Sequence, residues 1–420
     1  MKGGFRKHYY WVIAAVALLQ MLIYGGAVNN FSGYHMIPIT QTLEISRTMF
    51  SLAESARSVV GVFSTMFSGL ITRRFGYRNV TSAALLTASI AYVLFACLQS
   101  YWMLLIGCIM MGMAHGLCFS AGISRLVNDW FYKYRGTILG LVTAASGVGS
   151  SILGIVQSAA VERVSWRMSF AIVAGLQLAL ALILFVLVRN KPQDIGLRPY
   201  GVGQESSGNR PSVTWEGFSM ETLQKQPCYY AMLVCVVLSS VCVLSTQYNI
   251  VPYFQDCGMS VTRTGKLYGV MMLALSAFKL MLGVLCDAIG AKRVLVISHL
   301  ACAGGLSLIL LLPQTDGAMI TAMIVFDMAI PLTTMLFPLL GVELFGNRAH
   351  GIYVGTLVAM CTAGNIISGP VANLVYDLSG SYVPVFWSAA ALSLVMLPVY
   401  GILFAMIKRT AGKLKAAGQL

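Results

Sequence analysis

Two charged residues lie inside long apolar stretches, where charge is costly. Lys279 falls in the stretch Thr264–Leu285, and Asp327 falls near the middle of the stretch Ala318–Leu340. A charged side chain at the centre of a membrane costs about 2.5–3.5 kcal/mol on insertion scales. An ammonium there can bind a negatively charged solute, and a carboxyl there can gain and lose a proton. The alternatives are a Lys279 that extends to the membrane surface or is permanently paired, and an Asp327 that only holds helices together.

The same two residues could act together. Burial disfavours a carboxylate, whereas a nearby ammonium favours it. An anion bound to Lys279 would therefore shield the ammonium and let Asp327 take up a proton. This coupling of an anion to a proton predicts Asp327 as a proton-coupling residue.

The composition is that of a membrane protein. Of the 420 residues, 58% are hydrophobic and 10% are charged, whereas soluble domains contain about 25% charged residues. The net charge of +14 comes from cations in short loops between apolar stretches. That placement favours membrane topology over nucleic-acid binding. The cysteines are scattered without a C-x-x-C pair, and we predict neither a metal site nor a cofactor.

Twelve apolar stretches are each close to the ~20 residues that a helix needs to cross a membrane. The first is too long for a cleaved signal peptide, so we expect it to be retained as a span. The twelve stretches are Tyr10–Phe31, Phe50–Ile71, Val80–Leu98, Trp102–Leu126, Thr137–Val161, Ser169–Val188, Tyr229–Tyr253, Thr264–Leu285, Val294–Leu312, Ala318–Leu340, Tyr353–Val375 and Val383–Ile407.

The loops between these stretches differ in charge on the two sides of the membrane. With the N-terminus inside, the short inner segments carry fifteen Lys and Arg, and the outer segments carry five. Cytoplasmic loops are the ones enriched in Lys and Arg. We therefore expect a multi-pass protein of the cell membrane with both termini in the cytoplasm.

A polar stretch rich in Pro, Gly and Ser divides the chain into two parts. We interpret residues 189–227 as a cytoplasmic linker. Residues 1–188 form a predicted N-terminal six-helix bundle, and residues 228–420 form a C-terminal six-helix bundle with a short basic tail. The predicted fold is an all-α membrane protein with twelve transmembrane helices in two pseudo-symmetric bundles.

The two halves repeat with an offset of 214 residues. Several glycines, cations and aromatic residues recur at this one offset, which indicates an internal repeat rather than chance. The matching pairs are Gly69 with Gly283, Gly76 with Gly290, Arg78 with Lys292, Tyr34 with Tyr248, Pro38 with Pro252, Asp129 with Glu343 and Phe131 with Phe345.

The repeat indicates candidate functional residues in the first half as well. At the same offset, Thr65 is the counterpart of Lys279 and is expected to face the same cavity. Glu54 lies eleven residues earlier, only about 20° away around the helix at 100° per residue. Glu54 could close an outer gate, take part in proton coupling or pair with Arg57, and a simple helix-end ion pair is the alternative.

Other polar residues lie in apolar stretches and need partners. A substrate could be that partner, and hydrogen bonds between helices or aromatic residues at the interface are the alternative. A histidine in this position could also titrate near neutral pH. The candidates for substrate binding are Asn30, Tyr34, His115, Gln247, Tyr248 and Asn365.

The turn at Gly283 carries a recognisable motif. The segment Gly283-x-x-x-Asp287-x-x-Gly290-x-Lys292 resembles the signature Gly-x-x-x-Asp-Arg/Lys-x-Gly-x-Arg/Lys of the major facilitator superfamily. This family has the parallel six-helix repeats inferred above, and its members are secondary transporters with the site near the membrane midplane. The first copy of the motif has Arg73 where the family has the acid. The first copy therefore departs from the usual charge pairing.

A second set of residues resembles one branch of that family. Asp129-Trp-Phe-Tyr-Lys-Tyr-Arg135-Gly136 and Asp194-x-Gly196-Leu197-x-Pro199-Tyr200-Gly201 are similar to the monocarboxylate and oxalate–formate branch. In that branch, a cation four residues before the motif glycine of the eighth span contacts the substrate carboxylate, and Lys279 occupies this place. Some members carry an acid one turn earlier, where this chain has Leu275.

The resemblance and the charges together suggest gating residues. We expect Arg57 to act at the outer side and the others at the cytoplasmic side, where charged residues end the helices. The cytoplasmic candidates are Arg73, Arg125, Asp129, Arg135, Asp287 and Glu343.

The sequence thus predicts a secondary transporter for a small organic anion, with a monocarboxylate as the first candidate and a proton as the coupling ion. The partners implied are the anion, protons or a counter-anion, and the lipid bilayer, around a monomer. The alternatives are an anion exchanger of the oxalate–formate type, a multidrug or neutral-solute carrier of the same fold and, more remotely, a membrane sensor. No nucleotide-binding motif and no catalytic constellation indicates an enzyme.

Overall fold

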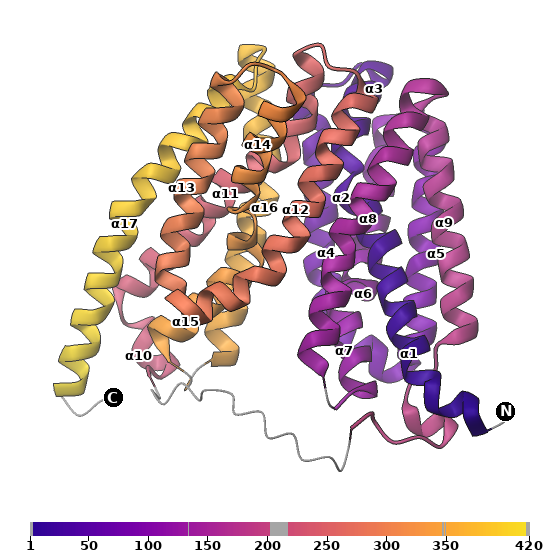
Figure 1. The fold of residues 1–420 in the computed structure, drawn as a ribbon, viewed down its shortest axis with the longest axis horizontal. Helices are drawn as coiled ribbons and strands as arrows, with labels where there is room; N and C mark the ends of the chain where they lie inside the picture. The colour runs from indigo at the N-terminus through magenta and orange to yellow at the C-terminus, as the bar shows by residue number, and fades with distance from the viewer. Residues whose placement is uncertain (1–2, 133, 202–216, 347, 349, 417–420) are drawn as a thin grey trace. The chain divides into compact units, whose positions relative to one another are not determined.

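The protein is described by a computed structural model that covers residues 3–132, 134–201, 217–346, 348 and 350–416. These residues are almost all helical (Figure 1) and contain no strand beyond an isolated bridge between Phe131 and Tyr200. A few side chains within helices, including those of Arg135 and Asp287, lie outside the described part. The predicted all-α membrane fold is confirmed.

The helices follow one another with short connections. In the first half they are α1 (Gly3–Gln20), α2 (Gly26–Asn29), α3 (Phe31–Leu43), α4 (Arg47–Phe75), α5 (Tyr77–Ala96), α6 (Tyr101–Cys118), α7 (Ser120–Trp130), α8 (Arg135–Arg163) and α9 (Trp166–Leu187). In the second half they are α10 (Met220–Gln224), α11 (Pro227–Asp256), α12 (Val261–Ile289), α13 (Ala291–Leu311), α14 (Asp316–Asp327), α15 (Phe337–Phe345), α16 (His350–Ser379) and α17 (Val383–Ala416).

The chain divides into two compact units. Unit 1 contains Met1–Ser207 with Val251–Ser276, and unit 2 contains Gly208–Ile250 with Ala277–Leu420. The end of α11 and the first part of α12 therefore belong to unit 1. Within unit 1, α5 packs along α9, and within unit 2, α13 packs along α14 and α17 (Figure 1). The predicted boundaries at residues 188 and 228 stay a prediction, because this division describes packing and not the repeat.

Eleven helical stretches in the described residues are long and apolar enough to cross a membrane. The predicted second span corresponds to α4, whose 29 residues would reach about 44 Å at 1.5 Å per residue. It is not among the eleven by composition, since Glu54, Arg57 and the arginines of its last turn make it less apolar. Length supports α4 as the twelfth span.

Three of the predicted continuous spans are interrupted. The first changes to a π-helical turn, η1, at Met21–Gly25. The fourth breaks at Phe119, where ψ is −135°. The tenth breaks before a second π-helical turn, η3, at Leu332–Leu336, because Pro331 has no N–H to continue the helix. Phe119 and Thr333, within η3, are 214 residues apart (333 minus 119), so these two breaks obey the repeat.

Close backbone contacts also obey the repeat. A Cβ atom on Gly149 of α8 would lie 1.8 Å from the carbonyl oxygen of Leu22 in η1. A Cβ atom on Gly364 of α16 would lie 2.9 Å from the carbonyl oxygen of Val237 in α11. The glycines are 215 residues apart, and both contacts occur within one unit. Small residues are required where helix backbones approach so closely.

The two motif turns have the same backbone conformation. Gly76 has φ 79° and ψ 150°, and Gly290 has φ 86° and ψ 149°. Each glycine ends one long helix and directly precedes the next, α5 or α13. A positive φ is readily adopted only by glycine. The matching turns predicted from the sequence are therefore present as matching structures.

Candidate functional site

Unit 2 holds a buried carboxyl group that no hydrogen bond satisfies. Asp327 is the last residue of α14, its exposed fraction is 0%, and neither carboxyl oxygen has a hydrogen-bond partner among the described residues. Lys279, half-buried in α12, interacts with it electrostatically. No ion pair within 4.0 Å joins these two described residues. Lys279 and Asp327 thus lie in apolar surroundings and interact without forming a direct ion pair.

The position of Asp327 follows from the break in its span. The peptide N–H of Ile330 donates to the carbonyl of Asp327 over 3.2 Å, which makes a tight turn before Pro331. From α13, the Ser298 hydroxyl donates to the carbonyl of Met328 over 3.4 Å. The turn is therefore held from a neighbouring helix, and the Asp327 side chain is placed where the helix ends.

Unit 1 holds a second acid and cation, and this pair is in contact. Glu54 and Arg57, both in α4, form an ion pair of 3.3 Å with side chains only 14% exposed. The Ser32 hydroxyl of α3 lies 2.8 Å from both carboxylate oxygens of Glu54 and donates to them. Of the roles considered for Glu54, the structure shows the pair with Arg57. Ser32 was not predicted.

His115 lies beside this pair, next to the break in the fourth span. Its ring stacks on Phe119 with centroids 4.4 Å apart, and its Nδ1 atom is buried without a hydrogen-bond partner. The charge of Arg57 acts on His115 and on the fully buried Tyr24 of η1. The structure therefore brings His115 close to the Glu54–Arg57 pair, whereas the sequence analysis considered it separately.

Asn30 and Tyr34 face α8. The Asn30 amide donates to the carbonyl of Ser150 over 2.9 Å, so a hydrogen bond between helices accounts for its nitrogen. The Tyr34 hydroxyl is buried and finds no hydrogen-bond partner in the residues that the structure describes, and a Cβ atom on Gly154 would lie 2.8 Å from it. The ring of Tyr34 meets Tyr268 edge-on at 6.2 Å.

The four other candidates for substrate binding lie in α4, α11 and α16. The hydroxyl of Thr65, an exposed residue, donates to the carbonyl of Gly61 in its own helix over 2.8 Å. Gln247 and Tyr248 are half-buried in α11. Asn365 is half-buried in α16, where its carbonyl accepts from Ser368.

Three of the cytoplasmic gating candidates, Arg73, Arg125 and Glu343, lie at or near the two turns. The Arg125 guanidinium in α7 donates to the carbonyl of Gly69 in α4 over 3.0 Å. Glu343 in α15 accepts from the N–H of Ala291 over 2.8 Å and lies 3.5 Å from the Lys292 ammonium. It thereby caps α13. Arg73 is exposed near the end of α4, and Asp129 is half-buried in α7. The side chains of Arg135 and Asp287 lie outside the described residues.

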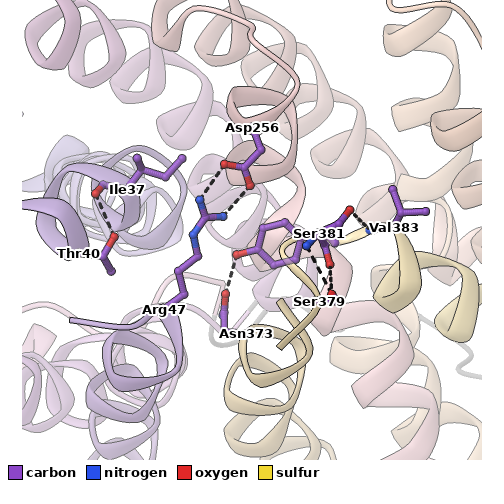
Figure 2. A network of polar contacts seen from close by, with 9 residues as sticks. Ile37, Thr40, Arg47, Asp256, Asn373, Ser379, Ser381 and Val383 are labelled. Carbon is purple, nitrogen blue, oxygen red and sulfur yellow. Dashed lines mark hydrogen bonds and ion pairs between the residues drawn. The ribbon is translucent and has the colours of Figure 1, made fainter. Parts of the chain in front are cut away.

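The sequence analysis missed a further set of ionic contacts in unit 1. Arg47 binds Asp256 through two hydrogen bonds of 2.7 Å, and Figure 2 shows the guanidinium facing the carboxylate. Glu162, near the end of α8, accepts from the N–H of Thr262 in the first turn of α12. Opposite charges in the outer loops were the available signal, but the sequence does not say which loops are neighbours.

Comparisons with known proteins agree with this architecture. A family model described as Major Facilitator Superfamily matches residues 16–368 and 233–419. The chain is 27% identical over 179 residues to a hexuronate transporter of Bacillus subtilis, covering 42% of each. It is 21% identical over 298 residues to monocarboxylate transporter 12 of Mus musculus, covering 66% of this chain and 61% of the relative. The aligned part therefore spans less than two thirds of the length of either relative.

Solved structures share the fold over nearly the whole chain. The nucleoside transporter NupG matches with a TM-score of 0.73 and 15% sequence identity, covering 94% of this chain and 99% of NupG. At this level of identity, the likeness concerns the fold alone.

Proposed function

Since the chain belongs to the major facilitator superfamily, we propose that it is a secondary transporter for a small organic anion, first of all a monocarboxylate. The solute would bind at Lys279 and cross by alternating access. In this proposal the protein lies in the cell membrane with both termini in the cytoplasm.

The observation that carries the proposal is the unsatisfied pair in unit 2. A buried carboxyl group without hydrogen bonds is unfavourable, and native structures retain few such groups. A cation that interacts with Asp327 but is not bound to it remains available for the carboxylate of a solute. The Arg57–Glu54 pair of unit 1 lacks this property, since its charges are already in contact.

The two relatives support the chemical class. A hexuronate and a monocarboxylate each carry one carboxylate, and these are the solutes in the names of the relatives described above. One cation of the chain suffices for such a group. In this proposal Lys279 supplies it.

Proton coupling follows from charge balance. Without solute, the Lys279 ammonium and the Asp327 carboxylate balance each other. When a solute carboxylate binds the ammonium, Asp327 accepts a proton from water, and the site keeps its charge. Release of the solute and the proton on the other side restores the first state. One anion and one proton thus cross together.

Uptake into proteoliposomes tests the proposal. We expect labelled lactate or pyruvate to accumulate when the outside is more acidic. Lys279→Ala should abolish this uptake, and Lys279→Arg should retain part of it, because the charge remains. Full uptake by Lys279→Ala would refute the role of Lys279. Uptake that needs a counter-anion inside and ignores the pH gradient would favour exchange over symport.

A further inference from the structure

The turn between α4 and α5 concentrates positive charge at the surface of unit 1. Arg73 and Arg74 are exposed in the last turn of α4, and Arg78 is half-exposed in the first turn of α5. Arg189, just after α9, lies close enough to influence the same tyrosine, Tyr9, as Arg78 does. These four arginines therefore lie at the end of α4, at the start of α5 and just after α9.

These charges are not balanced by acids. Among the described residues, no carboxylate lies within 4.0 Å of Arg73, Arg74 or Arg78. The Nε atom of Arg78 is buried and has no hydrogen-bond partner within the described part of the chain. The matching turn of unit 2 differs, because Glu343 there lies 3.5 Å from Lys292. Among the described residues, the arginines of the turn in unit 1 therefore have no paired carboxylate, whereas Lys292 in the matching turn has one.

Two of the guanidinium groups lie over exposed aromatic rings. The Cζ atom of Arg78 is 4.1 Å from the ring centroid of Phe185 in α9, and that of Arg74 is 5.4 Å from the ring centroid of Phe75. Phe75 is 56% exposed and Phe185 is 45% exposed. On a membrane protein, such rings meet acyl chains. Cations directly beside them lie at the height of lipid headgroups.

The site is held in a fixed shape. Asn190, which follows α9, accepts from the N–H of Arg78 over 2.9 Å. A Cβ atom on Gly76 would lie 2.6 Å from the Asn190 amide nitrogen, so the turn and the segment after α9 are packed together. The relative positions of the arginines and of Phe185 are therefore set by the fold of unit 1.

We propose that this turn binds the phosphate of an anionic phospholipid, with its acyl chains along Phe75 and Phe185. Guanidinium groups match phosphate oxygens in geometry and charge. The exposed rings favour a lipid over a soluble anion, because a soluble anion gains nothing from them. Each cation near an anionic membrane surface strengthens binding by about fivefold. The proposal does not depend on the identity of the transported solute.

The test compares the two turns in the full-length protein. The protein is placed in phosphatidylcholine nanodiscs with increasing phosphatidylglycerol, and retained lipid is counted by native mass spectrometry. Arg73→Gln with Arg74→Gln removes two charges from unit 1, and Lys292→Gln with Arg293→Gln removes two from the matching turn. We expect the first pair to weaken retention of phosphatidylglycerol by about 25-fold and the second by less than about twofold.

Three results would overturn the proposal: equal losses for both pairs, no loss for the first pair, or displacement of the lipid by inorganic phosphate, which would indicate a soluble anion. Thermal unfolding in pure phosphatidylcholine checks that the variants are folded. If the first pair is not, Arg74→Gln alone should weaken retention about fivefold, and Arg74→Lys should not. Absence of this difference would also count against the site.

Discussion

Each unit buries one acid and one cation among apolar helices, but the two pairs are built differently. In unit 1, Glu54 and Arg57 are 3.3 Å apart, and Ser32 donates to the carboxylate. In unit 2, Lys279 and Asp327 interact at longer range, and the carboxyl oxygens of Asp327 have no hydrogen-bond partner among the described residues. The closed pair lies within α4 and is joined to α3 through Ser32, whereas the open pair would leave both groups available for the solute and the proton of the proposal.

The two motif turns show a related difference. The glycines adopt the same backbone, yet α5 is capped by the neutral Asn190 and α13 by the charged Glu343. The neutral cap leaves the arginines of the first turn without a balancing charge. Equal geometry in two repeats therefore does not imply equal chemistry, and the partners of each charge have to be examined one by one.

The largest expected effect on stability comes from opening the closed pair. Arg57→Met would leave the Glu54 carboxylate buried without its cation, which typically lowers the free energy of unfolding by about 3–5 kcal/mol. Thermal unfolding in detergent would measure this. The double variant Glu54→Gln with Arg57→Met is the control and should recover most of the loss. If Arg57→Met is as stable as the wild type, the pair is not structural.

Asp327→Asn changes the open pair and should affect coupling more than stability. The amide keeps the shape of the carboxyl group but cannot carry the proton. A one-proton symporter can concentrate its solute about tenfold per unit of pH gradient, and the variant should lose this accumulation. We expect exchange of solute to continue and the free energy of unfolding to change by less than about 1.5 kcal/mol. Accumulation that still follows the pH gradient would exclude Asp327 as the coupling residue.

The caps of the two turns offer a matched pair of smaller effects. Asn190→Ala removes the acceptor for the Arg78 N–H and should lower the free energy of unfolding by about 0.5–2 kcal/mol. Glu343→Ala should lower the free energy of unfolding by the same amount and by a further amount of about 0.3–1 kcal/mol, since a carboxylate also interacts favourably with the dipole at a helix N-terminus. Chemical or thermal unfolding of both variants gives the comparison. A larger loss for Asn190→Ala would reverse the proposed order.

The smallest effect is expected where a pair reaches solvent. The side chain of Arg47 is 11% exposed, but that of Asp256 is 28% exposed, against 14% for both partners of the Glu54–Arg57 pair, and pairs whose charge reaches solvent contribute about 0–1 kcal/mol. Arg47→Gln should therefore lower the free energy of unfolding by no more than this, and the loss should shrink as salt is added. If Arg47→Gln lowers the free energy of unfolding as much as Arg57→Met, burial does not explain the difference between the Arg47–Asp256 and Glu54–Arg57 pairs.

Local patterns predicted much of this molecule. Apolar runs located the helices, the 214-residue offset located the two turns, and an isolated charge in an apolar run singled out Lys279 and Asp327. Such features depend on residues close together in the chain. Pro331 also carried a local signal for the break in the tenth span.

Partners from distant segments could not be predicted in the same way. Helix periodicity gives the face on which a residue lies, but not the helix that covers that face. Ser32 on Glu54, Asn190 on Arg78 and Asp256 on Arg47 all join residues far apart in sequence or on different helices. No proline lies at the break at Phe119, so the sequence did not predict that break.

The backbone contact at Gly149 limits how the molecule can move. Because the Gly149 backbone lies against the carbonyl of Leu22, we expect α8 and η1 to move together, and likewise α16 and α11, which meet at Gly364 and Val237. In a transport cycle, these pairs of helices would then move as rigid units. The conformational change would be confined to the interrupted segments beside Phe119 and Pro331.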